Sequence, residues 1–212
     1  MRVPAFIAFL LLASCIPKSD RPRADPPRPA QEGPSRSTLQ CRAELEREGV
    51  RFRALPDRFF ENGCSAAGAV QLLDIGTPVN NLGAITCPAA RQLARWVREA
   101  VQPAAEDAFG RRVVRIESVG TYSCRTVNSR PGAKLSEHGK ANAVDISAFV
   151  LDGGRRIAVL GGWSGEDEEV RRFLRAVHRA GCRRFSAGLG PDADAFHRDH
   201  LHFDMGQGPY CR

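Results

Sequence analysis

Apolar residues recur every three or four positions in two stretches of the chain, and this period predicts two amphipathic helices. The first stretch spans residues 87–101, and Pro88 and Pro103 are expected to mark its two ends. The second spans residues 164–181 and begins with Ser164 as the expected N-cap, followed by an acidic first turn. Each helix is expected to bury its apolar stripe.

Four runs rich in β-branched and other apolar residues predict strands. The glycine turn at 152–154 separates two of them and predicts a hairpin, so neighbouring strands should be antiparallel. The predicted strands cover residues 112–119, 143–151, 156–160 and 201–205. The expected fold class is α+β, a small, mostly antiparallel sheet with flanking helices.

The N-terminal region has the pattern of an export signal and a linker. Residues 1–14 combine one basic residue with an apolar run of about eleven residues, which is too short to cross a bilayer as a helix. The segment that ends at Cys15 resembles a bacterial lipobox, so we expect Cys15 to carry lipid and anchor the chain. Residues 15–40 are proline-rich and predict a linker, which leaves residues 41–212 as one domain.

Cysteine content and charge narrow the class of protein further. An even number of widely spaced cysteines in an exported domain predicts three disulfides, with fifteen pairings open. These residues are Cys41, Cys64, Cys87, Cys124, Cys182 and Cys211. The net charge of +7 comes from scattered basic residues that are not interleaved with aromatic ones, so no nucleic-acid interface is expected.

Four of the five histidines lie in two short segments, residues 136–147 and 196–206. On an extended strand His200 and His202 would leave the same face, and Asp204 would continue it. Two imidazoles and one carboxylate supply three ligands for Zn²⁺ and leave a fourth position open, which is typical of a catalytic site. His178 has no such neighbours, and we expect it on the polar side of its helix.

The residues Ser136-x-His138-x4-Ala143-x-Asp145, followed by His200-x-His202, resemble the zinc motif of the lysostaphin, D-Ala-D-Ala carboxypeptidase and hedgehog (LAS) group. Over residues 41–212 the sequences TYSCR, SEHGKANAVDI and DHLHFD also resemble the extensin-like C-terminal domain family.

The LAS resemblance implies that His138, Asp145 and His202 bind the metal and that His200 stabilises the developing oxyanion. The group usually has glycine three residues after the first histidine, where this chain has Ala141. The group's glutamate base is also missing.

Two residues stay open as the general base. Asp199 has the spacing of the carboxypeptidase branch but is one methylene shorter than the usual glutamate, and His197 has the spacing of the endopeptidase branch. By the same resemblance Arg125 would bind a substrate carboxylate. Ser136 and Asp204 are expected to orient the ligands through outer hydrogen bonds.

Together these features predict a zinc peptidase that acts on peptidoglycan stem peptides or cross-links in the periplasm, lipid-anchored and most plausibly at the outer membrane. The alternative is a non-catalytic envelope lipoprotein that uses the same cleft to bind wall peptide. A structural disulfide domain with a closed metal site is a third hypothesis. The bond cleaved and the oligomeric state stay open.

Overall fold

The computed structural model describes residues 33–212. The expected signal segment, Cys15 and the linker as far as residue 32 lie outside the described residues. In the described part of the chain, none of the helices combines the length and the apolar character that a membrane span requires.

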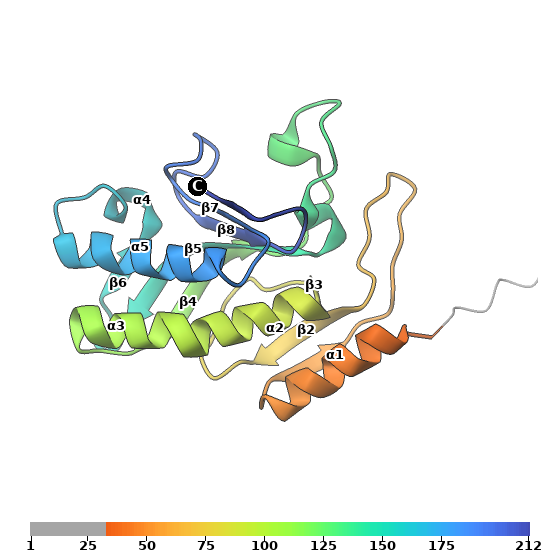
Figure 1. The fold of residues 1–212 in the computed structure, drawn as a ribbon, viewed down its shortest axis with the longest axis horizontal. Helices are drawn as coiled ribbons and strands as arrows, with labels where there is room; N and C mark the ends of the chain where they lie inside the picture. Colours follow the sequence, from red (N-terminus) through yellow and green to blue (C-terminus); the bar gives the residue numbers. More distant parts are fainter. Residues whose placement is uncertain (1–32) are drawn as a thin grey trace, which may run out of the picture. The chain divides into compact units, whose positions relative to one another are not determined.

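The largest element of the described domain is a six-stranded sheet in the order β4-β5-β8-β7-β9, with β6 paired to β5 (Figure 1). All of its pairings are antiparallel except that of β7 with β9. The strands are β4 (Val113–Gly120), β5 (Ala143–Leu151), β6 (Arg156–Ala158), β7 (Ala187–Leu189), β8 (Leu201–Asp204) and β9 (Tyr210–Cys211). The α+β class, the four predicted strands and the hairpin between β5 and β6 are therefore confirmed.

A second, three-stranded antiparallel sheet precedes the large one and was not predicted. It consists of β1 (Arg51–Ala54), β2 (Ala69–Asp74) and β3 (Ile85–Thr86). Its strands are short, and only β2 has a buried apolar face, so they give little alternation for a sequence pattern to reveal.

The first predicted helix continues past Pro103, contrary to expectation. α2 (Cys87–Trp96) passes through a π-helical turn, Val97–Val101, into α3 (Gln102–Phe109) without a break. The π turn widens the hydrogen-bond register just before the proline, which then lies in the first turn of α3. Inside a regular α-helix a proline ring clashes with the carbonyl four residues earlier and removes a hydrogen bond, so the wider π turn next to Pro103 is what lets the helix continue.

The second predicted helix is α5 (Glu168–Cys182), and its N-cap is Asp167 instead of Ser164. The Asp167 carboxylate accepts a hydrogen bond from the Val170 amide at 3.1 Å. A Cβ atom on Gly181 would lie 2.2 Å from the Phe203 ring. This glycine therefore lets α5 approach the sheet closely.

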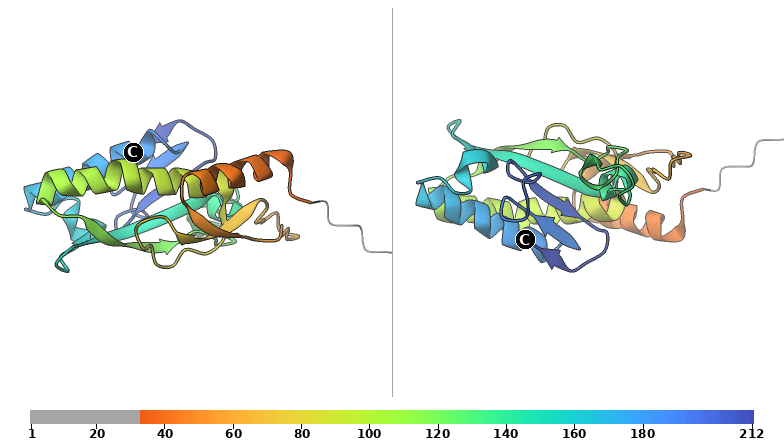
Figure 2. Two further views of the ribbon diagram at one scale, coloured as in Figure 1. Left: turned by 90° about the horizontal axis from the view of Figure 1, so that it is seen from below. Right: turned by 90° about the horizontal axis from the view of Figure 1, so that it is seen from above.

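The helices pack on one face of the large sheet, as the views from below and above show (Figure 2). Trp96 lies at the centre of this core, where its ring contacts Phe149 and Phe203 and its indole N–H donates to the carbonyl of Val177 at 2.9 Å. The short α4 (Val159–Gly162) lies between β6 and α5.

α1 (Arg36–Arg47) begins within the stretch that was expected to be linker. Ser35 caps it by accepting a hydrogen bond from the Thr38 amide. Ion pairs join its Glu44 and the adjoining Glu48 to arginines of α2.

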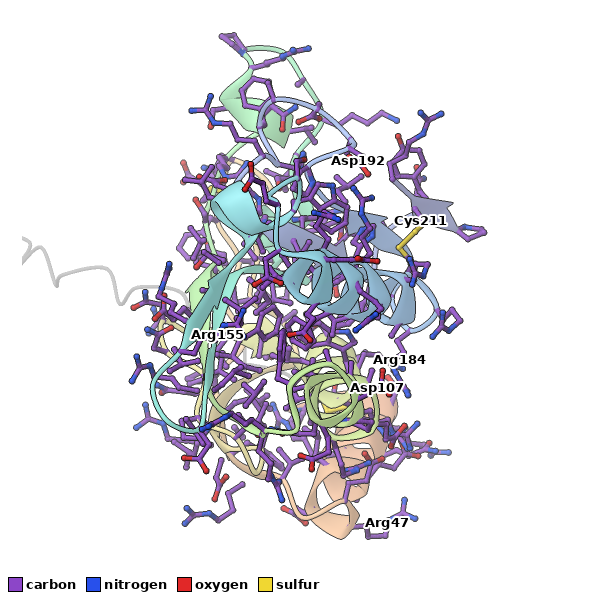
Figure 3. The ribbon with its side chains drawn as sticks, turned by 90° about the vertical axis from the view of Figure 1, so that its left-hand side faces the viewer. Arg47, Asp107, Arg155, Arg184, Asp192 and Cys211 are labelled. Carbon is purple, nitrogen blue, oxygen red and sulfur yellow. A yellow bond between two sulfur atoms is a disulfide. The ribbon has the colours of Figure 1, made fainter. Side chains whose placement is uncertain are left out.

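All six predicted cysteines form disulfides, as expected, and the structure supplies the pairing. The bonds are Cys41–Cys87, Cys64–Cys124 and Cys182–Cys211. The first links α1 to α2, and the third fastens β9 to the end of α5, where Figure 3 labels Cys211. The three crosslinks join elements that are 29 to 60 residues apart in sequence.

Candidate metal centre

The candidate site lies where β5 and β8 pair. Asp145 and His202 are opposite each other in the register of the two strands. His138 is carried by a short 3-10 turn, η3 (Glu137–Lys140), which directly precedes β5. Ser136 caps this turn by accepting a hydrogen bond from the His138 amide at 3.3 Å. Ser136 is thus a cap on the turn that presents His138, and no hydrogen bond joins its hydroxyl to a ligand side chain among the described residues.

The side chains of His138, Asp145 and His202 converge and are buried. His138 Nε2 lies 3.1 Å from His202 Nδ1 and 3.1 Å from Asp145 Oδ2. His202 Nδ1 lies 2.8 Å from Asp145 Oδ1. The three residues form a group whose ligand atoms all lie within 4.8 Å of one another, and such a group can hold a metal ion.

In His138 and His202, the ring nitrogen that points away from Asp145, termed the outer nitrogen, faces an oxygen atom that can only accept a hydrogen bond. His138 Nδ1 donates to the Thr121 carbonyl at 2.9 Å, and His202 Nε2 donates to Asp204 Oδ2 at 2.9 Å. These bonds assign the proton of each neutral ring to its outer nitrogen. The lone pairs of His138 Nε2 and His202 Nδ1 then point toward Asp145, which is the arrangement that metal-binding histidines use.

The surroundings of the centre favour the ionised form of Asp145 and the protonated form of His202. Burial opposes ionisation of Asp145, but hydrogen bonds from His138 and His202, formed when their inner nitrogens are also protonated, outweigh it and hold the pKa of Asp145 well below its usual range. Burial also opposes the charged form of His202, yet hydrogen bonds to Asp145 and Asp204 raise its pKa to about 9. In the metal-free centre a proton on His202 therefore balances the buried carboxylate.

A cavity of about 720 Å³ opens above the centre. His138 and His202 form part of its floor. One wall is the hairpin of residues 122–136, coloured green in Figure 1, and the other is the loop of residues 190–200 that leads into β8. Of the residues predicted for the site, the cavity is also lined by Arg125, Ser136, His197, His200 and Asp204.

The two remaining histidines of the cluster lie beside the centre. His200 Nε2 is 3.6 Å from Asp145 Oδ1, and its Nδ1 bonds the exposed Asp199 at 2.8 Å. His197 is buried, and its ring centroid lies 5.7 Å from that of His202. Asp199 is thus occupied by His200 and does not line the cavity.

His197 has an orienting partner that the sequence analysis missed. Its Nδ1 bonds Asp194 Oδ1 at 2.8 Å, and Asp194 lies three residues earlier in the same loop. Burial lowers the pKa of His197, although the bond to Asp194 acts in the opposite direction. The spacing Asp-x-x-His could have suggested this pair, whereas no sequence signal marks the backbone carbonyl of Thr121.

The prediction that His178 lies on the polar side of its helix is wrong. His178 is buried, with 5% of its surface exposed, and does not lie on the polar side of α5. Its ring lies edge-on to Trp163 and is stacked on Phe203. The apolar environment arises because α5 is covered on this side by the loop after α4, which the helical period of α5 alone does not reveal.

Comparison with protein families finds one match. The family described as Extensin-like protein C-terminus matches residues 39–212. Comparison with curated proteins and with solved structures finds no match.

Proposed function

The chain belongs to the extensin-like protein C-terminus family, and we propose that it is a zinc-dependent peptidase that acts on peptidoglycan peptides in the cell envelope. The observation that carries this proposal is the convergence of His138, Asp145 and His202 on one buried point at the floor of a cavity.

The three ligand atoms fit the size of a zinc ion. With Zn–N and Zn–O bonds of about 2.0 to 2.2 Å, two ligand atoms of a tetrahedral site are separated by roughly 3.3 Å. The separations of 2.8 to 3.1 Å in the metal-free centre require only a small expansion. Three protein ligands leave a fourth position toward the cavity, which is characteristic of catalytic zinc sites.

A bound zinc ion would lower the pKa of a water molecule from about 15.7 toward about 7 and polarise a peptide carbonyl. We assign the general base to His197. Asp194 holds its Nδ1–H, so its Nε2 lone pair is free, and burial keeps the ring neutral and able to accept a proton at neutral pH. Asp199 is the weaker candidate because it is exposed and already bonded to His200.

His200 is assigned to the substrate oxygen. Its Nδ1–H donates to the Asp199 carboxylate, which orients the ring. The ring lines the cavity, with Nε2 3.6 Å from Asp145 Oδ1, and once Nε2 carries a proton it can donate a hydrogen bond to the oxygen of a peptide carbonyl as negative charge develops. Removing one such donor costs about 2.7 to 4 kcal/mol of transition-state stabilisation in related chemistry.

The cellular setting remains part of the proposal. Three disulfides agree with an oxidising compartment such as the periplasm. A lipid on Cys15 and a proline-rich linker of about 3.1 Å per residue, ending where α1 begins, would let the domain reach a target roughly 60 Å from the membrane surface. Peptidoglycan lies at such a distance from an outer-membrane anchor.

The test is digestion of purified sacculi by the zinc-loaded full chain. Wild-type protein should release muropeptides, and His197→Gln should bind zinc normally but lower kcat by about a hundredfold or more, because only the base is lost. Asp199→Asn should have a smaller effect, since it perturbs only the orientation of His200. Zinc-loaded protein that binds sacculi without releasing any product would overturn the peptidase proposal and favour the non-catalytic alternative.

A further inference from the structure

The cavity is lined by charged side chains of both signs, and all the acidic ones have partners, whereas among its lysines and arginines only Lys140 is paired with a carboxylate of the described residues. Asp194 is bonded to His197, and Asp204 to His202 and the Gly206 amide. Glu137 is bonded to Lys140 at 2.6 Å and also to the amide of Asn142. Every acidic side chain that lines the cavity is therefore already engaged.

Two cations of the cavity lining, Arg125 and Lys134, are not paired with a carboxylate of the described chain. Among the residues that the structure describes, neither Arg125 nor Lys134 has an acidic partner within ion-pair distance. Arg125 is half-buried and Lys134 is exposed. These two side chains are therefore the cations of the lining that remain available to pair with a carboxylate of a ligand.

Both cations lie on one face of the hairpin that forms the cavity wall. Thr126 and Leu135 form an antiparallel bridge, and the Ser136 amide donates to the Arg125 carbonyl at 3.0 Å. Lys134 is two residues before Ser136, which makes Arg125 and Lys134 diagonal neighbours across the hairpin. Such neighbours are separated by roughly 7 to 8 Å. The two side chains therefore start from backbone positions that are separated by about the span of two residues of an extended peptide.

The opposite wall closes the space above these cations. Phe196 lines the cavity and is half-exposed, and the Arg130 guanidinium lies 5.5 Å from its ring centroid. This contact connects the hairpin to the loop that carries His197. A ligand in the cavity is therefore held between an apolar ring and the cationic face, and not on an open surface.

We propose that Lys134, with Arg125, forms a two-point carboxylate site that selects peptides carrying two carboxylates, one beside the scissile bond and one a residue away. Arg125 binds the first, because its carbonyl pairs with Ser136, which caps the turn that carries His138, and Lys134 binds the second. The position of the first carboxylate beside a scissile bond rests on the proposed peptidase function, whereas binding of the two carboxylates does not require turnover.

The test is calorimetric binding of four short peptides to the full chain, with zinc and after metal removal. The peptides share one backbone and combine glutamate or glutamine with a free or amidated C-terminus. The dicarboxylate peptide should bind about tenfold more tightly than either monocarboxylate peptide, and added salt should reduce the difference.

Lys134→Met should abolish the preference for one carboxylate and keep the other, and Lys134→Arg should restore both. Lys140→Met is the matched control: Lys140 also lines the cavity, but its ammonium group is held by Glu137, so the preferences should not change. Equal affinity for all four peptides, or equal weakening of all four by Lys134→Met, would overturn the proposal.

Failure of this site is distinguishable from failure of the proposed function. Carboxylate preference without turnover of any peptide would contradict the peptidase and leave the site intact. Turnover without carboxylate preference would contradict the site and leave the peptidase intact.

Discussion

Two groups of metal-ligating side chains lie in the described part of the molecule, and they are built differently. His138, Asp145 and His202 come from β5, β8 and the adjoining turn. The second group consists of His178, Cys182 and Cys211 on α5 and β9. Both groups bring three potential ligand atoms within 4.8 Å of one another. Proximity alone therefore does not separate them.

The difference lies in what each potential ligand atom already does. In the second group the two sulfur atoms are bonded to each other, and His178 Nε2 is 3.8 Å from the sulfur of Cys182. His178 packs between aromatic rings, and its hydrogen-bond partner is the backbone of Gly188, so it is held as a residue of the core beside a closed disulfide. In the first group the outer nitrogen of each imidazole is held by an acceptor, so the inner lone pairs converge. Orientation by outer hydrogen bonds thus separates a metal centre from a cluster of core residues.

The largest expected effect is loss of zinc from Asp145→Asn. The substitution removes the only negative charge among the three ligands and replaces it with a neutral amide. Zinc affinity should fall by more than about a hundredfold, because loss of an outer hydrogen bond alone costs 10- to 100-fold. Zinc titration against a competing chelator measures this change.

The matched substitution in the second group is His178→Ala. It should leave zinc affinity unchanged and lower the free energy of unfolding by about 2 to 4 kcal/mol, because it leaves a cavity beneath Trp163 and Phe203. Chemical denaturation of the metal-free protein measures the second value. If His178→Ala and Asp145→Asn weakened zinc binding equally, the distinction between the two groups would be wrong.

The two groups should also respond to pH in opposite directions. Because the pKa of His202 is raised to about 9, its contribution to the stability of the metal-free protein is fully present below about pH 6.5 and is lost as pH rises through about 9. Burial lowers the pKa of His178, so its contribution is present above about pH 6.5 and is lost as pH falls below that value.

Zinc binding adds a third pH dependence. Below pH 9 zinc must displace the proton of His202, so its affinity should fall about tenfold for each unit of decreasing pH. Unfolding midpoints of the metal-free protein from pH 5 to 10, together with zinc titrations over the same range, measure these slopes. Asp204→Asn should flatten the alkaline loss of stability, and His178→Phe should flatten the acidic one. Persistence of both slopes in both variants would contradict the assignment.

Sequence patterns predicted the helices and strands that contain long, regular runs of apolar positions. β5 was predicted with its observed bounds because nine consecutive positions, nearly all buried, form its strand. The convergence of Asp145 and His202 follows from the register of two such strands. The spacing of histidines within one segment, together with family resemblance, identified residues that the structure brings together.

The predictions from sequence are wrong where residues that are distant in sequence but close in space determine the local structure. A π turn that carries the helix past Pro103 depends on the preceding backbone register. The burial of His178 depends on Trp163, which is fifteen residues away in sequence. The choice between His197 and Asp199 as base, which the sequence left open, rests on the hydrogen bond between His197 and Asp194 in the folded loop.

The smallest expected effect concerns Ala141, which stands where relatives in the LAS group are expected to have glycine. Ala141 ends the turn that carries His138, and its φ of 55° is in the left-handed region that favours glycine. Its methyl group is fully buried against Ala66 and Ala69. Replacement by glycine would relieve about 1 kcal/mol of backbone strain but lose about 0.8 kcal/mol of buried methyl.

Because these two terms nearly cancel, Ala141→Gly should change the free energy of unfolding by less than about 0.5 kcal/mol and leave zinc affinity unaltered. Ala141→Val should cost more than about 2 kcal/mol, since a β-branched residue is strongly disfavoured at this φ and has no room beside Ala66. Denaturant titrations of both variants measure the difference. A gain above about 1 kcal/mol for Ala141→Gly would mean that packing does not compensate the strain in this turn, so that the first group is held in place at a cost in stability that the second group does not bear.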